Sequence, residues 1–179
     1  MMADERQRLL ELAEKSAATS VQLKGDNAPA RRFYGIAMNA TGEFSTTSDY
    51  IAKSYKVKEQ WLKAVELDPK DPNARHLIGR WCYDVANMSS FTRNIAAMVF
   101  RTPPTSSFEE ALKHFKAAED LKPGFWKSNV LYMGMCQYQL GRTDEAKAWI
   151  SKAICMPNQT SDDEVAHKEA ISWKSWLGM

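Results

Sequence analysis

The repeated unit that decides the fold is clearest in residues 127–157, KSNVLYMGMCQYQLGRTDEAKAWISKAICMP. Its landmarks are a glycine in the first half, a Leu-Gly break, and then a small, a large and a small residue before a proline: Gly134, Leu140-Gly141, Ala146, Ile150, Ala153 and Pro157. Small residues at helix contacts let two helices approach closely, and proline stops a helix. The stretch predicts two antiparallel helices in the pattern of a tetratricopeptide repeat.

Two earlier stretches carry the same landmarks in the same order. They are Tyr34-Gly35, Val57, Trp61, Ala64 and Pro69, and then Ile78-Gly79, Ala111, Phe115, Ala118 and Pro123. In both, the steps from the first small residue to the proline are 4, 3 and 5 positions. The glycine precedes that small residue by 12 positions in the last stretch, but by 22 and 32 in the earlier two. We interpret the surplus as a lengthened helix in the first pair and as an insert, residues 88–107, in the second.

These repeats predict one all-α domain over residues 1–179, a tetratricopeptide-like αα-superhelix. The expected helix pairs occupy about 28–69, 71–123 and 127–157, with an unpaired N-terminal helix before them and a capping helix at 161–177. Hydrophobic spacing and breaks place the single helices at about 4–23, 29–40, 48–68, 72–87, 91–100, 107–121, 127–140, 143–155 and 161–177. The first helix resembles the second half of a repeat whose first half would lie upstream.

Composition excludes several classes of protein. The 24 basic and 22 acidic side chains give a net charge of +2, which does not favour nucleic acid as a partner. The 3 cysteines lack paired spacing and are typical of reduced thiols rather than of a disulfide framework. No apolar run approaches the roughly 20 residues that a membrane-spanning helix needs, and no signal peptide is visible.

Catalytic and metal-binding motifs are missing from the sequence. His76, His114 and His167 are scattered, without the spacing of metal ligands, and the 8 glycines stand singly rather than in a phosphate-binding loop. We therefore expect no enzyme activity, no cofactor and no metal site.

A binding surface is the alternative to catalysis. In a stack of helix pairs the first helix of each pair lines a concave groove, and helical spacing turns these residues inward: Arg32, Ile36, Asn39, His76, Arg80, Tyr83, Asp84, Leu131, Met135 and Tyr138. Arginine and aromatic side chains are common anchors, so we expect an extended peptide, a helix or an apolar chain as ligand. Two alternatives stay open: Tyr83 and Tyr138 pack between the pairs, or the capping helix itself fills the groove.

Four stretches are more specific than the general repeat pattern. They are VKEQWLKAVELDPKD (57–71), NARHLIGRWCY (73–83), FRTPPTSSFEEAL (100–112) and FWKSN (125–129). Together with the long insert, they resemble the regulator of microtubule dynamics family, from about Lys15 to the last helix.

The resemblance implies a protein that associates with microtubules and supports spindle function and chromosome segregation. It implies a cytoplasmic location on the cytoskeleton, the spindle and the spindle pole. Some members carry an N-terminal membrane segment and tether mitochondria to the endoplasmic reticulum, where the repeat domain is linked to lipid binding. No such segment is visible here, which favours the microtubule-associated alternative over a lipid-binding or tethering module.

Basic side chains are the expected contacts to the acidic tails of microtubules. The candidates are Lys53, Lys56, Lys63, Arg93 and Arg101, and the alternative is that they only solvate helix surfaces. The short apolar helix of the insert, with Phe91, Ile95 and Met98 among its residues, is expected to pack on the repeats rather than to enter a membrane interface.

Overall fold

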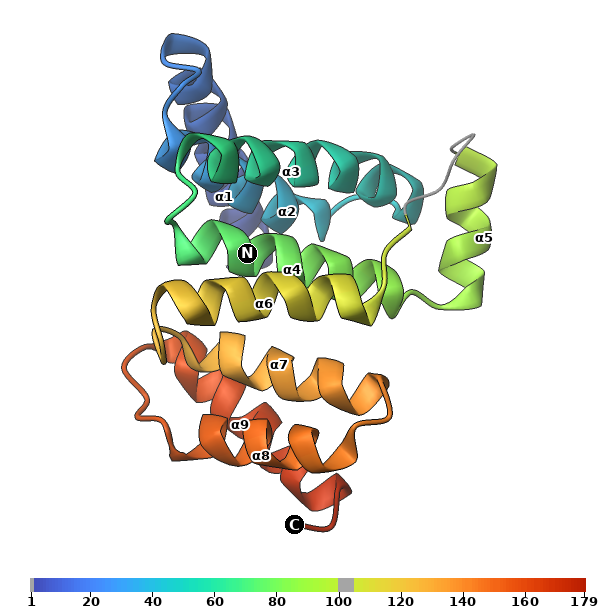
Figure 1. Ribbon diagram of the computed structural model, residues 1–179. Coiled ribbons are helices and arrows are strands. Elements are labelled where there is room, and N and C mark those ends of the chain that lie inside the picture. The colour runs from blue at the N-terminus through green and yellow to red at the C-terminus, as the bar shows by residue number, and fades with distance from the viewer. Residues whose placement is uncertain (1, 100–104) are drawn as a thin grey trace. The chain divides into compact units, whose positions relative to one another are not determined.

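The computed structural model describes residues 2–99 and 105–179, and this part of the chain holds helices and turns without a strand. The predicted all-α class is confirmed (Figure 1). Its helices are α1 (Met2–Leu23), α2 (Ala28–Gly42), α3 (Thr47–Leu67), α4 (Pro72–Ala86), α5 (Ser90–Val99), α6 (Phe108–Leu121), α7 (Lys127–Gln139), α8 (Thr143–Cys155) and α9 (Ser161–Trp176).

Polar side chains cap the helix starts close to the expected positions. Ser107, where the sequence predicts that this helix begins, caps α6 by accepting a hydrogen bond from the backbone N–H of Glu110. The helix α9 begins at Ser161 as expected, and its cap, Thr160, forms a reciprocal capping box with Asp163. Each cap satisfies N–H groups that have no partner inside the helix, which fixes where the helix begins.

The chain divides into two compact units. The first contains the described residues within Met1–Ala74 and Asn87–Thr105, and the second contains Arg75–Ala86 and Ser106–Met179. In the first unit α2 packs against both α1 and α3, and α5 packs against α3. In the second, α7 packs against α6, α8 and α9. The single domain expected from the repeats stays a prediction.

The glycine of each predicted pair lies under the large side chain of its partner helix. In the first unit, Gly35 lies against the indole of Trp61. In the second, a β-carbon on Gly79 would stand 2.8 Å from the Phe115 ring, and one on Gly134 would stand 2.8 Å from Ile150 Cγ1. These contacts are tighter than side chains allow, so glycine is required for the helices to approach this closely.

The second helix of each pair contributes the small residues that the pattern predicts. Ala64, Ala111, Ala118, Ala146 and Ala153 are all fully buried. Phe115 also fills the space toward the next pair, because its ring centroid lies 5.5 Å from that of Tyr132 on α7. The predicted alternation of small and large residues thus builds the core.

The insert helix α5 packs as expected rather than standing free. It contacts α3, and its Ala96 is fully buried. Phe91 and Met98 remain exposed on its other side. The side chains of Val99 and Phe100, which the sequence also assigns to its apolar face, lie outside the described residues.

Candidate functional site

The inward-facing candidates of the first unit lie on α2. The Arg32 guanidinium forms an ion pair with the buried carboxylate of Asp71 and lies 5.0 Å from the centroid of the Phe33 ring. Ile36 and Asn39 are exposed on the same helix. Arg32 therefore holds the start of α4 against α2, which leaves Ile36 and Asn39 as the accessible candidates here.

His76 lies in the core of the second unit, with 1% of its surface exposed. Its ring is 4.2 Å from Trp126 and 5.3 Å from Phe115, between centroids, and Nδ1 bonds Asn129 Oδ1 at 3.0 Å. Because Asn129 Oδ1 can only accept, Nδ1 carries the proton. Burial lowers the pKa of His76 to about 3, so the ring is neutral near pH 7. This position favours packing over direct contact with a ligand.

Arg80 and the tyrosines form the next layer of the second unit. The Arg80 guanidinium carbon lies 4.1 Å from the centroid of the Tyr132 ring, a cation–π contact. Tyr83 packs edge-on against Tyr132 at 5.2 Å and against Phe108 at 5.4 Å, between centroids. Burial raises the pKa of Tyr83 to about 12, so the phenol keeps its proton. Tyr83 is thus a packing residue, whereas Arg80 is only partly buried.

The capping helix α9 covers Tyr138 of α7. The Tyr138 ring lies 5.3 Å from Trp173 and 4.6 Å from Trp176, and the two indoles are 5.2 Å apart, all between centroids. The three rings pack at steep angles, which the aromatic quadrupole favours. The capping helix therefore lies over Tyr138, one of the residues expected to line the groove. The side chain of Trp176 nevertheless remains 61% exposed to solvent.

Two carboxyl groups lie within the electrostatic reach of Arg80. Burial raises the pKa of Asp84 on α4 and of Glu169 on α9, and the charge of Arg80 opposes both shifts. Arg80 Nε is buried and has no hydrogen-bond partner among the described residues. One guanidinium thus acts on two carboxyl groups, one on α4 and one on α9.

A shallow pocket of about 330 Å³ opens on this side of α9. Glu169, Ser172, Trp173 and Trp176 line it. Its walls combine two indoles with one carboxyl group, an arrangement suited to an apolar chain that carries a polar or cationic group. We call the surface formed by Arg80, Asp84, Tyr132, Tyr138, Glu169, Trp173 and Trp176 the inner-helix face.

Sequence spacing identified only part of the inner-helix face. Helical spacing named Arg80, Asp84 and Tyr138, together with Leu131 and Met135 on α7, and it did not name Tyr132, which is buried as those two α7 residues are. It also missed the α9 residues. The spacing of Trp173 and Trp176, one helical turn apart in a capping helix, was the available signal for them.

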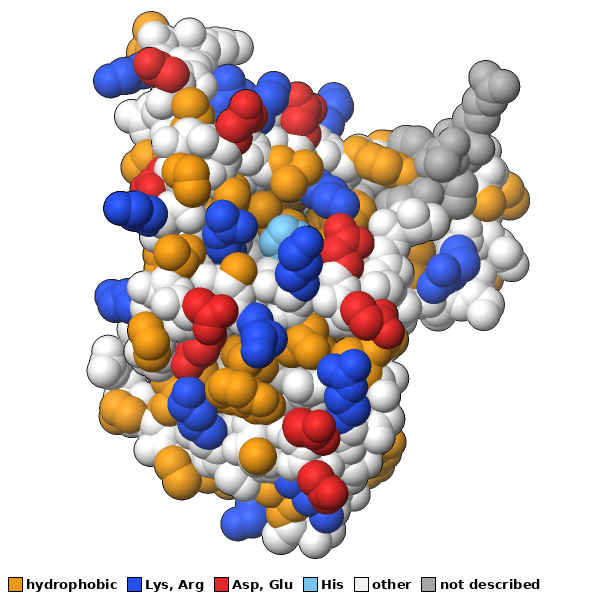
Figure 2. Space-filling model, in the orientation of Figure 1, with side chains coloured by type: hydrophobic (Ala, Val, Ile, Leu, Met, Phe, Trp, Pro, Cys, Tyr) orange, Lys and Arg blue, Asp and Glu red, His pale blue; other side chains and the backbone are white. Residues whose placement is uncertain are grey.

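The basic candidates for a microtubule contact differ in their surroundings. Lys53 Nζ bonds Glu14 Oε2 at 2.8 Å, and Lys63 Nζ bonds Glu59 Oε1 at 2.7 Å. Lys56 and Arg93 are exposed. Arg101 lies outside the described residues. Basic and acidic side chains alternate over the face that Figure 2 shows, so no broad basic patch gathers there.

The fold and the inner-helix face together define the class of protein. It is an all-helical protein of paired helices that presents aromatic and charged side chains on one surface. The chain belongs to the family described as Regulator of microtubule dynamics protein 1-3, which it matches over residues 2–174. The resemblance seen in the sequence is thereby confirmed.

Individual relatives agree. The chain is 36% identical over 167 residues to Regulator of microtubule dynamics protein 1 of Rattus norvegicus, covering 93% of this chain and 54% of that protein. It is 34% identical over 167 residues to protein 1 of Homo sapiens, covering 93% and 53%. To protein 3 of Rattus norvegicus it is 33% identical over 165 residues, covering 92% and 35%. The chain therefore spans about half of the first relative and about a third of the last.

Among the helices of the described residues, none combines the length and the apolar character that crossing a bilayer requires.

Proposed function

We propose that this chain is a non-enzymatic interaction module that associates with microtubules and supports spindle function and chromosome segregation. The family match over residues 2–174 carries the proposal, because the matching relatives are named for the regulation of microtubule dynamics. The helix pairs would act as a tetratricopeptide-type scaffold, in the cytoplasm on the cytoskeleton, the spindle and the spindle pole.

A binding role is supported by where the unusual side chains lie. His76 and Tyr83, whose pKa values are strongly shifted, are packed among aromatic rings, whereas catalytic acids and bases must reach a substrate. Trp176 is exposed instead and lines a pocket together with the half-buried Trp173, and tryptophan is enriched at the centres of protein interfaces.

Co-sedimentation tests the main proposal. Purified chain is mixed with stabilised microtubules across a series of salt concentrations, and the pelleted fraction is measured. We expect binding that weakens as salt rises, because the contact with the acidic tubulin tails is electrostatic. Microtubules whose tails have been removed by protease serve as the matched control. Equal pelleting in the presence and absence of microtubules at low salt would refute the proposal.

The second candidate is a lipid-binding or tethering module at membrane contact sites. The observation in its favour is the pocket on α9, where Trp173 and Trp176 form apolar walls. Flotation with liposomes of neutral and anionic lipid separates the two candidates. Co-flotation that is lost on Trp173→Ala, without microtubule binding, would favour the lipid module.

A further inference from the structure

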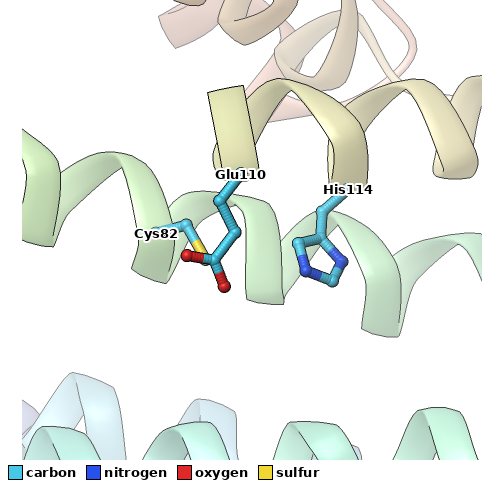
Figure 3. A group of neighbouring side chains, drawn as sticks. All are labelled: Cys82, Glu110 and His114. Atoms are coloured by element: carbon cyan, nitrogen blue, oxygen red, sulfur yellow. The ribbon is translucent and has the colours of Figure 1, made fainter. Parts of the chain in front are cut away.

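Three potential metal ligands from two helices of the second unit meet at one point. Cys82 lies on α4, and Glu110 and His114 lie on α6. One ligand atom from each, Sγ, a carboxylate oxygen and an imidazole nitrogen, lies within 4.8 Å of the other two. Figure 3 shows the three side chains directed to the same side of the two helices. The cluster shares no residue with the inner-helix face.

The fold explains why these side chains meet. Glu110 and His114 are four positions apart on α6 and so share one side of that helix. Cys82 follows Gly79 by one helical turn, and Gly79 is where α4 lies directly against Phe115 of α6. The close approach of the helices thus brings the Cys82 thiol to the pair on α6. The insert separates Cys82 from Glu110 along the chain, which is why the sequence shows no metal-binding motif.

The donor set matches a known preference. Thiolate sulfur, imidazole nitrogen and carboxylate oxygen are the three protein ligands of Zn²⁺, bound at about 2.0–2.3 Å. Tetrahedral ligands at those distances are roughly 3.3–3.8 Å from one another. Atoms that already lie within 4.8 Å reach that arrangement by small side-chain rotations. Three protein ligands leave a fourth position for water, as in zinc sites that are not purely structural.

The surroundings of the cluster also suit a bound cation. Ser106 Oγ donates a hydrogen bond to Glu110 Oε2 at 2.7 Å, which orients the carboxylate as outer-shell partners of metal ligands do. Cys82 is fully buried, whereas Glu110 and His114 are only partly buried. The Cys82 thiol is thus the buried end of the cluster, and the two α6 ligands form its partly exposed side.

We propose that Cys82, Glu110 and His114 form a binding site for one divalent ion of the Zn²⁺ class. The site is independent of the proposed microtubule function. The alternative is that the three groups are only a polar cluster that stabilises the packing of α4 and α6.

Cobalt substitution tests the site on the whole chain. The protein is stripped with a chelator under reducing conditions and titrated with Co²⁺, which reports thiolate ligation by a charge-transfer absorption. We expect the band to saturate at one equivalent and to be displaced by Zn²⁺. Cys82→Ala abolishes the band, and Glu110→Gln and His114→Ala each weaken Co²⁺ binding by more than roughly tenfold. Ser106→Ala weakens it about 10–100-fold, the usual effect of losing an outer-shell partner.

Cys155→Ser is the matched control, since it removes an exposed thiol outside the cluster. It should bind Co²⁺ as the unchanged chain does. Far-ultraviolet circular dichroism confirms that each variant is folded, and if Cys82→Ala does not fold, the Glu110 and His114 variants decide. No charge-transfer band at one equivalent, a band that disappears in Cys155→Ser, or unchanged affinity in His114→Ala would overturn the proposal.

Discussion

Gly79 of α4 lies directly against the Phe115 ring of α6, and a β-carbon at that position would stand 2.8 Å from both Cδ1 and Cε1. The ring cannot retreat, because Phe115 is fully buried and also packs against His76 and Tyr132. The pair therefore sets the distance between the two helices.

Gly79→Ala should destabilise the fold by about 1–3 kcal/mol, the usual cost of overpacking. This loss exceeds the gain of up to ~1 kcal/mol in helix propensity. Urea unfolding followed by circular dichroism measures the difference. Gly25→Ala is the control, since its new β-carbon would stand 3.2 Å from the flexible end of Arg31 and 3.5 Å from the Val21 carbonyl oxygen. Equal stability of the two variants would contradict the packing argument.

The helices and their pairing were predictable because the signals that specify them are local. The spacing of Gly79, Ala111 and Phe115 indicates the helix contact, and Ser107 marks the start of α6, from a few residues of sequence. The division of the chain was not predictable in the same way. The insert helix α5 belongs to the same compact unit as α3, although it interrupts the pair formed by α4 and α6. Only tertiary contacts decide that grouping.

His76 should make stability depend on pH. Its folded pKa of about 3 lies below the ordinary value of 6.5, so the unfolded chain binds the extra proton. The stabilisation is complete above about pH 6.5 and is lost as the pH falls toward 3, with a slope of ~1.4 kcal/mol per pH unit. Urea unfolding at several pH values measures the slope, and His76→Gln should reduce it by that amount between pH 4 and 6.

His167→Gln is the matched control for this experiment, because it makes the same substitution at a histidine that is only partly buried. Equal slopes for the unchanged chain and His76→Gln would show that His76 is not buried as a neutral ring.

The candidate site was harder to predict than the fold. Helical spacing predicts which residues share one side of α4, but it does not predict which other segments of the chain cover that side. His76 was expected to face a ligand, yet Trp126, from the turn before α7, lies over its ring. Conversely, Trp173 and Trp176 join the inner-helix face only because α9 packs against α7. Contacts between distant segments decide both outcomes, and spacing within one helix does not report them.

Tyr138→Ala should loosen α9 before the rest of the second unit. The substitution removes two aromatic contacts, to Trp173 and Trp176, each worth about 0.5–1.5 kcal/mol beyond the buried area. We expect a loss of roughly 1–3 kcal/mol and faster amide hydrogen exchange in α9 than in α8, measured by mass spectrometry. Phe91→Ala, at a side chain that is 74% exposed, should change stability by less than about 0.5 kcal/mol.

Arg80→Met should raise the pKa of both Asp84 and Glu169 further. The charge of Arg80 currently opposes the upward shift that burial imposes on these carboxyl groups. Titration of the labelled carboxyl carbons by nuclear magnetic resonance measures both values. Arg142→Met is the control, because Arg142 acts on Glu109 and on neither of these groups. If the pKa values of Asp84 and Glu169 are the same in Arg80→Met as in the unchanged chain, Arg80 does not act electrostatically on these two carboxyl groups.

Lys56→Glu should lower the affinity for microtubules while leaving the stability of the fold nearly unchanged. Lys53 and Lys63 already neutralise Glu14 and Glu59, so reversing their charge disturbs the protein itself. Lys56 is exposed on the same helix and is in none of the ion pairs found among the described residues. One exposed ion pair is worth up to ~1 kcal/mol, so we expect an affinity about fivefold lower in co-sedimentation at low salt, with the difference vanishing at high salt. Lys116→Glu makes the same charge change on α6 and is the control. Equal affinities for the two variants would exclude the α3 surface as the microtubule contact.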